Sequence, residues 1–346
     1  MIKNQKYFAA ANSYNGFVSF FREIFNSEEF ERIYVIKGGP GTGKSSLMRA
    51  LAKEHGEKVD EIEEIYCSSD PHSLDGVIIK HENKKIAIID GTAPHERDAV
   101  IPGVKDEIIN LGANWDARFL SAYKDDIISL NKEKSKAYLT AYSYLSQAGC
   151  IAEFIRGIYK GIFSKNKAKS KADEIFSSIS TSKNAFHDIR LLSSFGKYGA
   201  YNLSLNCEKI VKVSTDDFYS NILLDCFTDY LVFHNIDFRL FPYALSPKQT
   251  DALYIPDAKI GIVKGENPDI ISEEYFNSSP YDMERVKTAR TIYNIAMEEA
   301  TRWFNIASDI HFRLEEIYSS AMNFEKNDEI LYNKSNEIRN ILDLQI

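Results

Sequence analysis

Eight residues near the start of the chain have the types and spacing that phosphate chemistry requires. Residues 38–45 read Gly-Gly-Pro-Gly-Thr-Gly-Lys-Ser, which matches the pattern G-x-x-x-x-G-K-[ST]. Glycines accept positive φ, so the N–H groups of such a loop can converge on an anion. The lysine adds a positive charge and the serine hydroxyl suits Mg²⁺. The pattern therefore predicts a site for Mg²⁺ and a nucleoside triphosphate.

Each residue of this loop has an expected role. We expect Gly38, Gly39, Gly41 and Gly43 to adopt positive φ, Lys44 to reach the β- and γ-phosphates, and the Ser45 hydroxyl to ligate Mg²⁺. The predicted nucleotide-binding residues are Gly38, Gly39, Pro40, Gly41, Thr42, Gly43, Lys44, Ser45 and Ser46.

The residues on either side of the loop place it between a strand and a helix. The apolar run 33–36 is typical of a buried strand, and residues 46–52 are typical of a helix. A strand, a glycine loop and a helix in this order distinguish a phosphate-binding loop from a chance match, and the helix adds the positive end of its dipole.

A second motif supplies a carboxylate. Residues 85–90, Lys-Ile-Ala-Ile-Ile-Asp, form an apolar run that ends in Asp90. This is the Walker B pattern, in which the carboxylate at the end of a strand holds Mg²⁺. We expect Lys44 and Asp90 to be catalytic, and Ser45 and Asp90 to bind the metal. Gly91 stands where many ATPases have an acidic residue, so no hydrolytic base is assigned.

Several other residues are candidates for the chemistry around these two motifs. His95 and Glu96 could orient a water molecule, although ordinary loop residues would explain both. A third strand is expected at 65–67, and it leads to Asp70 in a polar turn. The carboxyl end of a strand is where ligands bind in open α/β sheets.

Composition excludes several classes of protein. The chain has 346 residues, is 44% hydrophobic and 27% charged, and carries a net charge of −8. These values are typical of a globular protein, and an acidic balance makes nucleic acid an unexpected partner. The four cysteines lack metal-ligand spacing. No segment resembles a membrane helix or the apolar core of a signal peptide, so we expect a cytoplasmic protein that does not bind a membrane.

The two halves of the chain resemble each other at a nearly constant shift. Pro71 and Asp75 correspond to Pro247 and Asp251 at a shift of 176, and residues 86–91 correspond to 260–265 at a shift of 174. An internal duplication is therefore predicted. In the second half, residues 215–222 replace the loop, with Asn221 in place of the lysine. Lys264 stands in place of Asp90, so ordinary nucleotide binding is not expected there.

Long helices and a basic segment complete the predicted organisation. Helices are expected over 132–163 and 282–323, and we expect them to pack together as a layer or lid on the nucleotide side. The lysine-rich run 164–171 has the composition of an exposed linker or hairpin tip. The predicted domains are 1–163, a P-loop domain with a helical extension, 164–185, the linker, and 186–346, a degenerate P-loop-like domain with long C-terminal helices.

The motif segments together are similar to a known family. Residues 36–45, 67–79 and 90–95 resemble an uncharacterised bacterial family of tandem P-loop ATPases, described only as ATP-binding or nucleotide-kinase-like. The resemblance is tight over 16–115 and loose over 190–280, and this chain departs from the family in its second loop. It implies an α/β fold with a duplicated P-loop core, a mostly parallel sheet in three layers, and ATP as ligand. It implies no physiological substrate.

Three functions are compatible with these features. The first is an ATPase that couples hydrolysis to a conformational switch, in which Lys264, Arg97 or Arg118 could stabilise the transferring phosphoryl group. The second is a kinase for a nucleotide or another small acceptor, with Asp70 as base. The third is a nucleotide-gated scaffold with little turnover. ATP is preferred over GTP because no guanine-type Asn/Thr-Lys-x-Asp motif is present.

Overall fold

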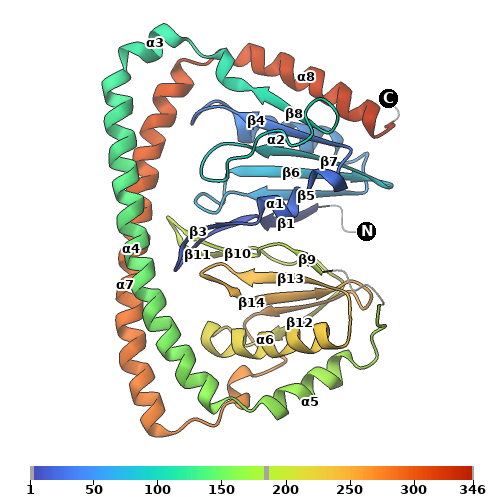
Figure 1. Cartoon of the computed structure of the whole chain (residues 1–346), viewed down its shortest axis with the longest axis vertical. Coiled ribbons are helices and arrows are strands. Elements are labelled where there is room, and N and C mark those ends of the chain that lie inside the picture. Colours follow the sequence, from blue (N-terminus) through green and yellow to red (C-terminus); the bar gives the residue numbers. More distant parts are fainter. Residues whose placement is uncertain (1–3, 183–186, 345–346) are drawn as a thin grey trace. The chain divides into compact units, whose positions relative to one another are not determined.

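The computed structural model describes residues 4–182 and 187–344. The chain is of the α/β class and divides into two units, each built from separate stretches of sequence (Figure 1). Unit 1 comprises residues 1–10, 19–140 and 302–346, and unit 2 comprises residues 11–18 and 141–301. These units differ from the predicted domains, because residues 302–346 belong to unit 1 and residues 141–163 belong to unit 2.

Unit 1 contains a six-stranded sheet in the order β1-β5-β6-β7-β4-β8. The strands are β1 (Asn4–Phe8), β4 (Arg32–Lys37), β5 (Glu61–Tyr66), β6 (Leu74–His81), β7 (Lys84–Asp90) and β8 (Asp106–Asn110). Three pairs are parallel, namely β1/β5, β7/β4 and β4/β8, while β6 is antiparallel to both neighbours. The sheet is therefore mixed, and the expected mostly parallel arrangement holds only at its two sides.

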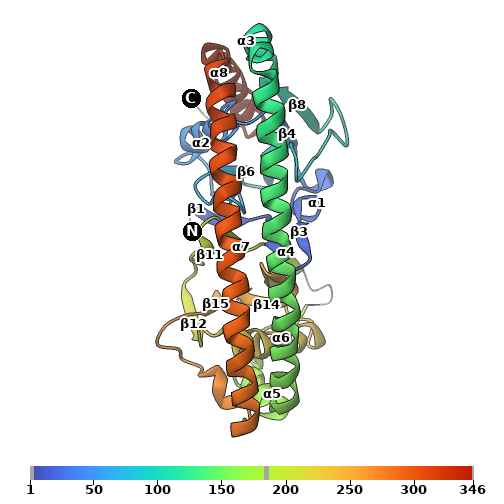
Figure 2. The same cartoon turned by 90° about the vertical axis from the view of Figure 1, so that its left-hand side faces the viewer.

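Helices complete unit 1. They are α1 (Phe21–Ile24), α2 (Lys44–His55), α3 (Ala117–Ala122), α8 (Phe324–Ile341), the first part of α4 (Lys124–Ile162) and the last part of α7 (Pro280–Ser320), with short 3₁₀ turns η1 (Ser27–Glu29) and η2 (Leu111–Asn114). Figure 2 shows α4 beside α7, and in unit 1 Tyr138 meets Phe304 edge-on at 5.9 Å. The predicted packing of the two long helices is thus present within this unit.

Unit 2 contains a five-stranded sheet in the order β12-β15-β14-β13-β9. Its strands are β9 (His187–Ile189), β12 (Lys209–Val213), β13 (Phe238–Tyr243), β14 (Ser246–Ile255) and β15 (Ile260–Lys264). The helix α6 (Asp217–Phe233) packs on this sheet, and α5 (Lys165–Phe176) and the turn η3 (Ser272–Tyr275) pack on α6. Two hairpins complete the strands, β2 (Ala10–Ser13) with β3 (Gly16–Ser19) and β10 (Ser193–Gly196) with β11 (Gly199–Asn202).

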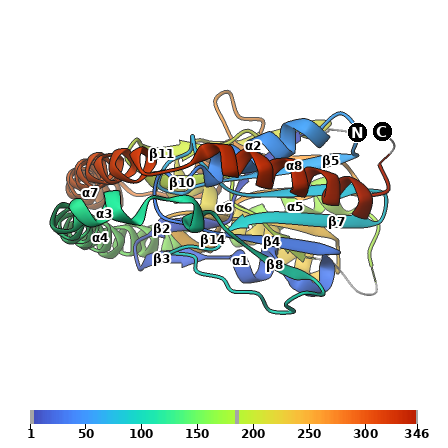
Figure 3. The same ribbon diagram turned by 90° about the horizontal axis from the view of Figure 1, so that it is seen from above.

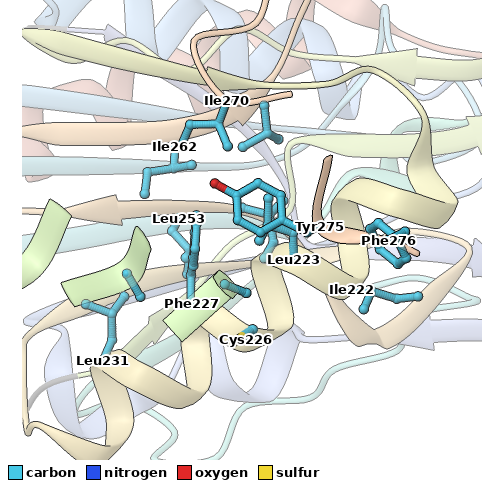
Figure 4. Packing of buried hydrophobic residues seen from close by; sticks show 14 of the residues in the cluster. Ile222, Leu223, Cys226, Phe227, Leu231, Leu253, Ile262, Ile270, Tyr275 and Phe276 are labelled. Carbon is cyan, nitrogen blue, oxygen red and sulfur yellow. The ribbon is translucent and has the colours of Figure 1, made fainter. Parts of the chain in front are cut away.

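The core of unit 2 forms between α6 and its sheet (Figure 4). Leu223, Phe227 and Leu231 lie on one face of α6 at i, i+4 and i+8, which is the spacing of an amphipathic helix. They pack with Leu253 of β14 and Ile262 of β15. Burial of each such side chain contributes about 1.5–3 kcal/mol.

The lysine-rich segment is a helix, and the expectation of an exposed linker or hairpin tip does not hold for 165–176. Ala168, Ala172 and Phe176 recur every four residues and are buried, while Lys167 and Lys169 are exposed. The charged residues concealed this narrow apolar stripe, which packs α5 on α6. Residues 183–185 of the predicted linker lie outside the described residues.

Registers in the two sheets agree with the shifts seen in the sequence. Ile79 lies opposite Ile86 in unit 1, and Ile255 lies opposite Ile260 in unit 2. Likewise, Arg32 pairs with Ile86, and Lys209 pairs with Ile260. The strand successions β1-β5-β6-β7-β4 and β9-β13-β14-β15-β12 therefore match in order and in relative direction.

Candidate phosphate-binding site

The glycine loop joins β4 to α2 in unit 1, as the sequence predicts. Residues 33–36 of β4 are fully buried, which explains their uninterrupted apolar run. Gly41 and Gly43 have φ of 67° and 86°, whereas Gly38 and Gly39 are not among the glycines with positive φ. Gly38 is needed for another reason, because a Cβ there would lie 2.6 Å from Thr42 Oγ1.

The N-terminus of α2 carries no side-chain cap. Its N-cap is Gly43, and no side chain accepts a hydrogen bond there. The first turn of a helix has N–H groups without helical partners and the positive end of the dipole, so an uncapped N-terminus favours an anion. Burial of Leu47, Met48 and Leu51 fixes α2 beside the sheet.

Lys44, the first residue of α2, lies between the loop and Asp90. Its Nζ donates hydrogen bonds to the carbonyls of Gly38 at 3.2 Å and Gly39 at 2.8 Å, and it is 3.6 Å from Asp90 Oδ2. Asp90 comes into reach because β7 is the parallel neighbour of β4, with Ile36 opposite Asp90. The structure thus brings together the two predicted catalytic residues.

The other carboxylate oxygen of Asp90 is hydrogen-bonded by Thr92, two residues further along the chain. Asp90 Oδ1 accepts hydrogen bonds from Thr92 N at 2.9 Å and Thr92 Oγ1 at 2.6 Å. Ser45 Oγ accepts a hydrogen bond from Leu74 N at 2.9 Å, which leaves a second lone pair on the hydroxyl. One hydroxyl, one carboxylate and phosphate oxygens form a donor set that Mg²⁺ prefers. The predicted ligands Ser45 and Asp90 therefore fit this metal.

The remaining predicted binding residues differ in their environment. Thr42 is buried, and its Oγ1 donates to the Gly39 carbonyl at 2.9 Å. Pro40 is half-buried and Ser46 is exposed. Among the described residues, no group of three or more His, Cys, Asp and Glu side chains is arranged to hold a metal ion.

His95 positions the end of β7 and is not placed to orient a water molecule. Its Nδ1 is 3.1 Å from the Asp90 carbonyl and its Nε2 is 3.3 Å from Asp75 Oδ2, while Phe21 stacks on the ring at 4.3 Å. Burial by itself lowers the pKa of His95, but the hydrogen bond to Asp75 and the carboxylates of Asp75 and Asp90 raise the pKa above its usual value. Glu96 is exposed. Asp75 is the carboxylate partner of this ring.

The three cations considered for charge stabilisation lie in different settings. The Arg97 guanidinium is bound to Asp106, Ser27 Oγ and the Phe25 carbonyl, so it stabilises the fold. Arg118 is exposed on α3. Lys264 forms ion pairs with other residues of unit 2, described next.

Unit 2 has a short turn with a capping carboxylate in the position of the glycine loop. Its ion pair at this position has the opposite polarity, because the carboxylate is on the helix and the lysine is on the strand. A turn of three residues, 214–216, joins β12 to α6, and Asp216 caps α6 by accepting from Phe218 N at 2.9 Å. Asp217, the first residue of α6, pairs with Lys264 at the end of β15. The counterpart of Lys44 in position is therefore Asp217 and not Asn221, because the turn is shorter than an ungapped comparison assumes.

Residues from the C-terminal helices contact the loop, and local sequence reasoning does not find them. The Glu315 carbonyl of α7 lies 2.5 Å from where a Cβ on Gly41 would stand, so only glycine fits there. Asn327 Nδ2 of α8 donates to the Thr42 carbonyl at 2.9 Å. Figure 3 shows α8 beside α2, where Ser335 Oγ is 3.2 Å from His55 Nε2. Because 285 residues separate Asn327 from Thr42, no motif spans both.

No protein-family model, curated protein or solved structure matches this chain. The resemblance to tandem P-loop ATPases therefore stays a prediction. Within the described residues, every helix is too short or too polar to cross a membrane.

Proposed function

We propose that this chain binds Mg²⁺ and a nucleoside triphosphate, ATP by preference, at the loop of unit 1. The observation that carries the proposal is the position of Lys44. It is the first residue of an uncapped helix and lies 3.6 Å from the carboxylate that ends the adjacent parallel strand. A helix N-terminus, an ammonium group and a metal-ligating carboxylate together suit a polyphosphate.

In this proposal, different residues of the chain contact the phosphates and the metal ion. Loop N–H groups and Lys44 bind the phosphates, Ser45 and Asp90 hold the metal, and Thr92 keeps one Asp90 oxygen in place. Lys44 has to exchange its contacts with the Gly38 and Gly39 carbonyls for phosphate oxygens. A bound Mg²⁺ supplies charge neutralisation to the phosphate oxygens.

The proposal includes a duplicated P-loop core. The two successions match in strand order and in strand pairing, and a helix follows the last strand of each, β4 and β12; these features support the duplication. In the second copy the helix N-terminus is already satisfied by Asp216. That contrast supports assigning the anion site to unit 1 alone.

Hydrolysis coupled to a conformational switch is the reaction we favour. Support comes from the helices in contact with the loop, since rearrangement at Gly41 or Thr42 would act directly on Glu315 and Asn327. Cytoplasmic location and an unidentified protein partner or small acceptor belong to this proposal.

Two observations favour the alternatives. Both His95 ring nitrogens are engaged and Glu96 is exposed, so neither of these two candidates is placed to act as a base beside Asp90, which favours a scaffold with little turnover. The Asp70 turn is tied to α2, because Ser45 accepts from Leu74 N and Arg49 donates to the His72 carbonyl. That connection favours a kinase in which Asp70 faces the acceptor.

A turnover assay separates these functions. Release of nucleoside diphosphate, the product common to hydrolysis and phosphoryl transfer, is measured with each of four nucleoside triphosphates and Mg²⁺, for the wild type, Lys44→Ala and Asp90→Ala. We expect ATP-dependent release that both variants abolish. Release that rises only with added small metabolites indicates the kinase, and binding without release indicates the scaffold. Unchanged ATP affinity in Lys44→Ala refutes the site itself.

A further inference from the structure

The Asn327 side chain connects α8 to one carbonyl of the phosphate-binding loop. Its Nδ2 donates to the Thr42 carbonyl at 2.9 Å, and its Oδ1 accepts from Asn114 Nδ2 at 3.0 Å. Asn327 is buried, and Asn114 directly follows β8 through η2. Because both ends of the amide are bonded, its orientation is fixed.

This bond determines the direction of an N–H group in the loop. In a planar trans peptide, the C=O of Thr42 and the N–H of Gly43 point in opposite directions. The Thr42 carbonyl points to α8, so the Gly43 N–H points away from α8. An anion that accepts from the Gly43 N–H has to lie on the side opposite α8, since α8 occupies the other side. Asn327 therefore presents the Gly43 N–H to the anion.

The corresponding junction of unit 2 lacks this amide. Asn327 is the fourth residue of α8, which follows a bridge between Trp115 and Met322. The fourth residue of α5 is the buried Ala168, and α5 follows a bridge between Phe163 and Phe276.

Backbone hydrogen bonds confirm that the two junctions correspond. Asn323 N donates to the Asn114 carbonyl at 2.9 Å in unit 1, and Ser164 N donates to the Tyr275 carbonyl at 2.7 Å in unit 2. The same junction thus carries an amide where the loop is present and a methyl group where a short turn replaces it. Docking of the helix alone does not require the amide.

We propose that Asn327 is a positioning residue of the phosphate site, an inference that rests on the proposed function. It orients the Thr42–Gly43 peptide for phosphate and makes the C-terminal helix part of the nucleotide site. It contacts no reacting atom, and its effect passes through the main chain of the loop.

The test compares binding and folding in the full chain. Affinities for Mg-ATP and for inorganic tripolyphosphate with Mg²⁺ are measured by calorimetry for Asn327→Ala and Asn327→Asp. Ala reproduces the residue found in α5, and Asp keeps the shape but replaces the donor by a negatively charged acceptor. We expect both probes to bind roughly tenfold more weakly, the effect of one hydrogen bond to a charged group.

A matched control separates positioning from docking. Ser335 lies on the same helix and contacts His55 of α2, away from the loop. Ser335→Ala should lower the thermal midpoint while leaving both affinities unchanged. Should Asn327→Ala fail to fold, Asn114→Ala loosens the same amide from its far side and should weaken both probes about threefold.

A spectroscopic signature identifies the group that moves. In protein labelled with ¹⁵N-glycine, we expect the Gly43 amide resonance to shift on addition of tripolyphosphate, and this shift to be reduced in Asn327→Ala. Equal affinities in the wild type and the Asn327 variants overturn the proposal, as does an equal loss in Ser335→Ala. A wild type that binds neither probe removes the proposed function and this inference together.

Discussion

Removal of the Lys264 ammonium group should destabilise unit 2 through the carboxylates that it leaves behind. The Lys264 side chain is 16% exposed and forms ion pairs with Asp217 and Asp251, and its ammonium lies 4.6 Å from the centre of the Tyr243 ring. Lys264→Met keeps most of the apolar stem of the side chain. The perturbation therefore deletes charge while changing little volume.

The loss of stability in Lys264→Met depends on which of the two carboxylates stays buried after the ammonium group is removed. The Asp217 side chain is 42% exposed and is rehydrated at little cost, whereas the Asp251 side chain is only 5% exposed. Asp251 keeps a hydrogen bond from Ser193 Oγ at 2.7 Å. Loss of one partner of a buried pair costs about 3–5 kcal/mol. Because Asp217 is partly exposed and Asp251 retains one hydrogen bond, we expect Lys264→Met to lower the free energy of unfolding of unit 2 by about 2–4 kcal/mol.

The pH dependence of this effect has a defined sign. Burial by itself lowers the pKa of Lys264, but the carboxylates of Asp251 and Asp217 outweigh it and raise the pKa above its usual value. A group with a raised folded-state pKa contributes its full stabilisation below its unfolded-state pKa, about 10.4 for lysine. The difference between wild type and variant should therefore stay constant from pH 6 to about 9.5.

Hydrogen exchange is the appropriate assay, because both tryptophans, Trp115 and Trp303, lie in unit 1 and fluorescence would miss unit 2. Exchange of peptides from α6 and β14 gives the free energy of opening for unit 2. The control is Lys259→Met, since Lys259 and Glu208 form a pair with side chains 58% and 64% exposed. Loss of this exposed pair should change the stability little, because water and salt screen it.

A rescue variant tests the stated cause. In Lys264→Met/Asp217→Asn/Asp251→Asn the uncompensated charges are gone, so most of the lost stability should return. Two results would refute the view that uncompensated carboxylates cause the loss. One is a loss of stability in Lys264→Met smaller than that in Lys259→Met, and the other is a triple variant no more stable than Lys264→Met.

Three further outcomes are expected for unit 1. Lys44→Ala should weaken Mg-ATP binding by at least a hundredfold in calorimetry, while Lys53→Ala, exposed at the far end of the same helix, should leave it unchanged. Asp90→Ala should abolish the increase in ATP affinity that Mg²⁺ produces, and an undiminished response to Mg²⁺ would remove Asp90 from the metal site. His95→Phe keeps a ring to stack but strands the buried Asp75 carboxylate, so unfolding should cost about 2–4 kcal/mol less. Because the pKa of His95 is raised, its stabilisation is complete below about pH 6.5 and fades as pH rises through the folded-state value, so this deficit should be larger at pH 6 than at pH 9.

Short-range features of the site were predictable because they follow from local backbone rules. Gly41 and Gly43 with positive φ, α2 beginning at Lys44 and Asp90 ending a strand all depend on residues within a few positions of each other. The nearly constant offset between the two halves, which the strand pairings of both sheets follow, was likewise visible in the sequence. In contrast, α5 was misread, because its apolar stripe is only one residue wide between lysines.

The sequence by itself determined where the glycine loop begins, which helix follows it and which strand ends in a carboxylate, since adjacent residues fix dihedral angles and periodicity. Tertiary structure alone decided that β7 lies next to β4, that Asp75 holds His95, that Asp217 and Lys264 reverse the Lys44–Asp90 pair, and that Asn327 reaches Thr42. The reason is physical. These contacts join segments up to 285 residues apart, and their free energy exists only after strand pairing and helix docking have brought the segments together.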